Sequence, residues 1–134
     1  MVIRLGGQVI ADTTAALRVL ETSHPPVYYV PQASFPSGVL TPASGSSWCE
    51  FKGHAAYFDV SAGDAVVRRG GWHYPAPRAG FEQLAGMVAV YPGRMESCRL
   101  GDEVVRAQEG NFYGGWVTSR VVGPFKGEPG TMGW

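Results

Sequence analysis

The side chains best suited to chemistry stand close together near the middle of the chain. Lys52 lies amid aromatic and apolar neighbours, where an amine can bind an anion, act as a base or act as a nucleophile. Cys49 can supply a nucleophilic thiolate if a cation lies beside it, and Lys52 or His54 can supply that cation. Glu21 is a candidate to orient Lys52 or to serve as a general base. The ordinary alternatives are a surface lysine, an inert buried cysteine and an exposed carboxylate.

A β-hairpin must position these groups, and its register decides which of them meet. Residues 48–60 read as one long strand that returns antiparallel through residues 65–74. A three-residue turn places Lys52 opposite Tyr74 and His54 opposite Trp72, on one face. A two-residue turn slips the register by one residue and breaks this grouping, because successive side chains point to opposite faces.

A bulge at a glycine is a further alternative within the first strand. Gly53 carries no side chain, and a bulge there turns Cys49 and Lys52 toward the same side.

Aromatic residues are unusually many for a short chain. A few of them converging would form a cage for a flat or cationic ligand, although core packing must account for most of them. The amphipathic rings considered are those of Tyr28, Tyr29, Trp48, Tyr57, Trp72, Tyr74, Tyr113 and Trp116.

The elements around the hairpin are predicted to be short strands. Turn-forming residues recur about every ten positions between runs of β-branched and aromatic residues, and no helical period is sustained. We expect a hairpin over 2–11, one helical turn and then a strand over 13–21, a strand over 27–30 and a helical turn over 81–84. Residues 32–47, rich in Ser, Pro and Gly, read as a long loop. Strands over 85–91, 95–100 and 103–107 are expected to form a meander.

Composition excludes several classes of protein. The chain has 134 residues, and 11 Lys and Arg balance 11 Asp and Glu, so no net field attracts nucleic acid or anionic lipid. The two cysteines cannot form a disulfide scaffold, and no metal-ligand spacing or phosphate-binding loop occurs. We therefore expect no metal, no cofactor, no nucleic acid and no membrane partner, and a cytoplasmic location.

Four runs of sequence resemble the bacterial family called domain of unknown function 427, which is sometimes labelled nucleotidyltransferase-like. These are ETSHPPVYYVP from Glu21, WCEFKGHAAYFDV from Trp48, WHYPAP from Trp72, and the closing FYGGWVTSRVVGPFKGEPGTMGW. The resemblance implies a compact antiparallel β domain similar to the β-tent group, in which two sheets meet at an angle. It also matches motif positions at Glu21, Tyr29, Cys49, Lys52, Gly53, Tyr57, Trp72 and Tyr74. The chain shows no pair of metal-binding carboxylates next to a Gly-Ser element, which a nucleotidyltransferase would need.

Together these observations predict a mainly β fold. We expect a compact antiparallel β domain of two packed sheets, β-tent-like or an open barrel, with at most short helical turns. We expect one domain over 1–134, with the Gly- and aromatic-rich tail 108–134 packed on the body or on a partner subunit in a homodimer.

The predicted function is binding of a small organic ligand in an aromatic-lined pocket. Lys52 would pair with an anionic group on the ligand, and Glu21 would hold Lys52 in place. The alternatives are a small enzyme that uses Cys49 or Lys52 in the same pocket, and a protein-interaction module that uses the tail. The predicted ligand-binding residues are Glu21, Tyr29, Cys49, Lys52, Tyr57, Trp72, Tyr74 and Trp116.

Overall fold

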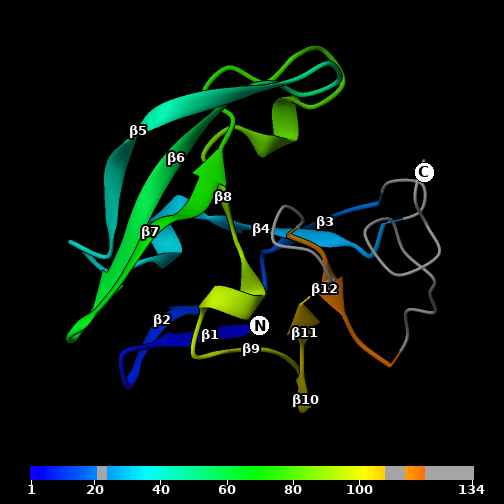
Figure 1. Ribbon diagram of the computed structural model, residues 1–134. Helices are drawn as coiled ribbons and strands as arrows, with labels where there is room; N and C mark the ends of the chain where they lie inside the picture. Colours follow the sequence, from blue (N-terminus) through cyan, green and yellow to red (C-terminus); the bar gives the residue numbers. More distant parts are fainter. Residues whose placement is uncertain (21–23, 108–113, 120–134) are drawn as a thin grey trace, which may run out of the picture.

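Short antiparallel strands make up most of the protein. The computed structural model describes residues 1–20, 24–107 and 114–119, and within them the strands form three sheets (Figure 1). A four-stranded sheet has the order β10-β9-β1-β2, a six-stranded sheet has the order β3-β4-β8-β7-β6-β5, and β11 pairs with β12. The mainly β prediction is confirmed, and the described strands do not close into a barrel.

The four-stranded sheet contains β1 (Val2–Leu5), β2 (Gln8–Asp12), β9 (Ser97–Leu100) and β10 (Glu103–Val104). The six-stranded sheet contains β3 (Leu17–Val19), β4 (Val27–Pro31), β5 (Leu40–Cys49), β6 (Gly53–Ala62), β7 (Ala65–His73) and β8 (Met87–Val90). The two-stranded sheet contains β11 (Arg106–Ala107) and β12 (Trp116–Val117). The helical segments of the described residues are the 3-10 turns η1 (Gln32–Ser34), η2 (Glu82–Leu84) and η3 (Pro92–Arg94), and none could cross a membrane.

The main core lies between the two larger sheets, which Figure 1 shows one above the other. Ile3 of β1 and Ile10 of β2 pack in one buried cluster with Val60 of β6 and Val88 of β8. Alternation along each strand sends these side chains to the core and their neighbours to the opposite face. The six-stranded sheet therefore has a second face, and a smaller cluster that includes Ala55 and Ala89 lies there.

The register of the β6–β7 hairpin differs from the one we expected. Ala62 pairs with Ala65, so the turn has two residues, and the predicted pairing of Lys52 with Tyr74 is wrong. The register then shifts between Phe58 and Val60, because β7 bulges at this point. Beyond the bulge Tyr57 pairs with Trp72.

Residues 40–52 also differ from the prediction. The expected long loop contains β5, which pairs with β6 along its length as the edge of the sheet. Its side chains are mostly exposed, so no apolar pattern marks it as a strand. The expected long strand from Trp48 begins only at Gly53, because residues 50–52 form the turn between β5 and β6.

Two local predictions are wrong, each for its own reason. Residues 13–16 form no helical turn, and Thr13 Oγ1 instead accepts a hydrogen bond from the Ala15 N–H at 3.0 Å. The predicted meander is not formed, since β8 pairs with β4 and β7 while β9 pairs with β1 and β10. The hairpin over 2–11 and the helical turn at η2 are confirmed.

Candidate functional site

A cavity of about 220 Å³ lies on the second face of the six-stranded sheet. Five of the predicted residues line it: Tyr29, Lys52, Tyr57, Trp72 and Tyr74. The remaining lining residues are His24, Pro25, Val27, Ser47, Ala55 and Tyr91. They come from β4, β5, β6, β7 and the segments that adjoin them, so the cavity extends across several neighbouring strands.

The bulged register explains why these side chains converge. Tyr57 and Trp72 are directly opposite each other, and residues two positions along a strand share the same face. Ala55 pairs with Ser47, and Trp72 pairs with Ala89, so small side chains alternate with large rings across the sheet. The small residues leave the space that the rings surround.

The aromatic wall is a chain of ring contacts. The Tyr29 ring centroid lies 6.4 Å from that of Trp72, edge to face, and 6.4 Å from that of Tyr74. Trp72 also contacts Tyr91, with centroids 4.6 Å apart. Tyr29 and Tyr74 are buried, so the wall presents mainly apolar ring surface to the cavity.

Lys52 enters the cavity from the turn between β5 and β6. Only 7% of its surface is exposed, although lysine is among the residue types least often buried. Its Nζ lies 4.0 Å from Cys49 Sγ and 5.8 Å from the centroid of the Phe81 ring. Cys49 and Lys52 thus lie on the same side, as the Gly53 alternative required, but a turn and not a bulge brings them together. Gly53 has a φ of 110°, a conformation that favours glycine.

Hydroxyl groups also line the cavity. The Tyr57 hydroxyl donates a hydrogen bond to Ser47 Oγ at 2.9 Å. Burial, with a smaller contribution from the nearby Tyr57, raises the pKa of the Tyr91 phenol. The Tyr91 phenol is therefore protonated at neutral pH, and its O–H can donate a hydrogen bond to an acceptor on a ligand.

Two predicted residues that the structure describes do not line this cavity: Cys49, although it lies beside Lys52, and Trp116. Trp116 is fully buried in the main core, where its ring centroid lies 5.2 Å from that of Tyr28. Glu21 lies outside the described residues, as does most of the tail 108–134. The tail nevertheless reaches the site at Gly114, because a Cβ on that glycine would contact the Trp72 ring.

The sequence analysis missed His24, Ser47 and Tyr91. Tyr91 directly follows the apolar strand β8, and its position after a buried strand is the signal that could have identified it. Ser47 was missed because its strand was read as a loop.

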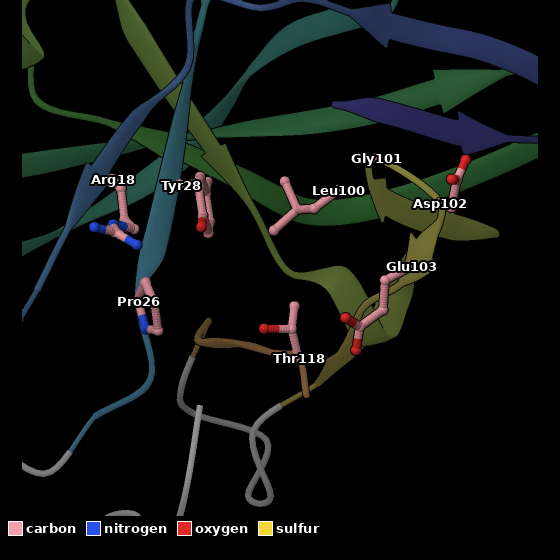
Figure 2. Close-up of a pocket in the computed structure, with 8 residues that line it drawn as sticks. All are labelled: Arg18, Pro26, Tyr28, Leu100, Gly101, Asp102, Glu103 and Thr118. Carbon is pink, nitrogen blue, oxygen red and sulfur yellow. The ribbon is translucent and has the colours of Figure 1, made fainter. Parts of the chain in front are cut away.

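A second, larger cavity of about 800 Å³ lies elsewhere and contains none of the predicted residues (Figure 2). Arg18 and Tyr28 stand on one side of it, and Asp102 and Glu103 stand on the other. The Glu103 carboxylate already accepts hydrogen bonds from the Ser119 N–H at 2.6 Å and the Ser119 hydroxyl at 2.8 Å. This cavity is the weaker candidate for a ligand site, because its walls carry charges of opposite sign and the Glu103 carboxylate is already hydrogen-bonded. Within the described ranges, no group of three or more His, Cys, Asp or Glu could hold a metal ion.

The fold and the site define a mainly β protein with a small aromatic pocket and a buried lysine. The chain belongs to the family described as domain of unknown function 427, whose model matches residues 1–101. Every residue that lines the smaller cavity falls within this match. The mainly β fold is consistent with the β-tent-like shape that the resemblance implied. A search of curated proteins found no match.

Proposed function

We propose that the protein binds a small planar organic anion in the cavity of about 220 Å³. The main support for this proposal is that Lys52 is only 7% exposed and lines a pocket otherwise dominated by tyrosine and tryptophan rings. Aromatic walls favour a flat ligand, and an ammonium group favours an anionic substituent on it.

The size of the cavity limits the ligand. A cavity of roughly 150 Å³ holds one benzene molecule, and drug-sized ligands occupy roughly 300 Å³ or more. The cavity therefore suits one ring or two fused rings with a small charged substituent. A nucleoside triphosphate is too large for it.

Isothermal titration calorimetry with three probes of equal ring size tests this function. We expect benzoate to bind more tightly than neutral benzamide, and the cation benzylamine to bind most weakly. Lys52→Met removes the charge and keeps most of the apolar stem, so it should weaken benzoate binding about tenfold or more and leave benzamide unchanged.

Arg18→Gln is the matched control, because Arg18 lines the larger cavity. It should leave benzoate binding unchanged. Equal binding of the three probes, or the same loss in both variants, contradicts the proposal.

Thiol chemistry in the same pocket is the second candidate function. It is favoured by the 4.0 Å between Cys49 Sγ and Lys52 Nζ, because a neighbouring cation stabilises a thiolate. Alkylation of Cys49 by iodoacetamide at neutral pH should be faster in the wild type than in Lys52→Met. Equal alkylation rates for the two proteins exclude this activation.

A further inference from the structure

Backbone strain occurs beside the pocket, at Arg69 in β7. Arg69 has a φ of 51°, and no other non-glycine residue of the described segments has a positive φ. It belongs to the bulge in which residues 68–70 of β7 oppose the single residue Asp59 of β6. Strained residues and bulges of this kind persist where they re-aim a side chain for a function.

Three side-chain contacts hold the bulge in place. Asp59 Oδ1 accepts a hydrogen bond from the Arg69 N–H at 2.8 Å, and Asp59 Oδ2 accepts one from Arg68 Nη1 at 3.1 Å. Arg94 Nη2 donates to the Arg68 carbonyl oxygen at 2.8 Å. The strained backbone of residues 68–69 is thus held by Asp59 of β6 and by Arg94.

The bulge places the exposed Arg69 guanidinium against the Tyr57 ring, next to the residues that line the cavity but not among them. Its central carbon lies 4.1 Å from the centroid of the Tyr57 ring, which lines the cavity. On another side the guanidinium faces Gly45, where any Cβ would come within 3.3 Å of it. Arg94 lies nearby, with its guanidinium carbon 5.9 Å from the centroid of the Tyr91 ring.

No acid of the described residues forms an ion pair with the guanidinium of Arg69 or Arg94. Among residues 1–20, 24–107 and 114–119, the ion pairs are Arg4 with Glu96 and Arg68 with Asp59, and neither includes Arg69 or Arg94. Asp59 is the nearest acid of the bulge, and its carboxylate binds Arg68 and a backbone N–H. Beside Tyr57 and Tyr91 the rim of the pocket therefore carries two guanidinium groups that no described acid pairs with.

Lys52 and Arg69 lie at different positions along the length of β6. Lys52 precedes β6, whereas Arg69 faces Asp59 near the far end of that strand, with Ala55 and Tyr57 between them. The geometry points to a ligand with two anionic groups, one bound by Lys52 and the second by Arg69, with its ring against Trp72. This inference rests on the proposed function and narrows its ligand to aromatic dianions.

Calorimetry with matched pairs of monoanions and dianions tests whether the ligand carries two anionic groups. The probes are benzoate against terephthalate, and phenylacetate against the longer and more flexible 1,4-phenylenediacetate. We expect the better dianion to bind the wild type about tenfold more tightly than its monoanion. In Arg69→Gln the ratio should fall to about one while the monoanion affinity stays within about twofold of the wild type.

Arg68→Gln is the control, because it removes the adjacent cation, whose side chain is 80% exposed, while the contacts of Asp59 and Arg94 with the bulge backbone remain. It should keep the preference for the dianion. Arg69→Gly provides a second test, since glycine adopts a φ of 51° without strain. It should lose the preference while its Tm stays within roughly 3 °C of the wild type.

The outcomes separate the two proposals. Equal binding of monoanion and dianion to the wild type, or a preference that survives Arg69→Gln, overturns the inference and leaves the proposed function standing. A fall in Tm of more than about 8 °C in Arg69→Gly shows that the guanidinium serves packing, and also overturns it. Failure of every probe to bind the wild type overturns both.

Discussion

The two cysteines should differ sharply in reactivity, because their surroundings differ. Cys98 of β9 is 1% exposed in the main core, and burial raises the pKa of its thiol to about 12. At pH 8 a thiol with this pKa is ionised about 1,000-fold less than one with the ordinary value of 9.0. A thiol reagent such as Ellman's reagent should therefore label only Cys49 in the folded protein, and both cysteines in 6 M guanidinium chloride.

The raised pKa also makes stability depend on pH. Above pH 9 the unfolded chain loses the Cys98 proton while the folded protein keeps it, so folding is stabilised below pH 9 and loses stability up to about pH 12. The slope is about 1.4 kcal/mol per pH unit. Between pH 8 and pH 10.5 the free energy of unfolding should fall by about 2 kcal/mol from this group alone.

Urea unfolding at the two pH values measures this loss. Cys98→Ala lacks the thiol, so its stability should fall about 2 kcal/mol less than that of the wild type over the same range. Tyrosine and lysine titrate in both proteins, and their effects cancel in the difference. Cys49→Ser is the control and should behave as the wild type does. Parallel losses in the wild type and Cys98→Ala would refute the reasoning.

Two further predictions concern other contacts. Gly114→Ala places a methyl group against the Trp72 ring, so it should destabilise the protein by about 1–3 kcal/mol in urea unfolding. It should also weaken benzoate binding in calorimetry. Unchanged stability and affinity would contradict the observed contact. The Gly7 N–H at 2.7 Å, and then Arg4, lower the pKa of Glu96 below its usual 4.5. Its carboxylate therefore stabilises the fold above about pH 4.5 and stops doing so as the pH falls through the lowered value, so Glu96→Gln should show a weaker acid dependence in thermal unfolding. An acid dependence equal to that of the wild type would count against this role.

Much of the candidate site could be predicted from residue types alone. Tyr29, Trp72 and Tyr74 combine large apolar rings with polar atoms, and Lys52 is a cation between aromatic neighbours. These properties depend only on the side chain and its close neighbours in sequence. The prediction failed for Trp116, because a single aromatic residue has the same local pattern in a core as in a pocket.

Strand β5 shows why part of the fold could not be predicted. Its sequence, with Ser, Pro and Gly, has no alternating apolar pattern, because its edge position leaves most of its side chains in solvent. It is a strand because its backbone pairs with β6, and this pairing does not require apolar side chains. A polar edge strand and a loop therefore look alike in sequence.

The sequence by itself determined that this protein is mainly β and which residue types could form an aromatic, positively charged pocket. These features follow from local propensity and from alternation, which neighbouring residues set. The tertiary structure alone decided that Tyr57 faces Trp72, that Lys52 lies beside Cys49 and that Arg69 packs on the Tyr57 ring. The physical reason is that a two-residue turn and a bulge set the register, and contacts such as Asp59 with the Arg69 N–H, ten residues apart, hold that bulge.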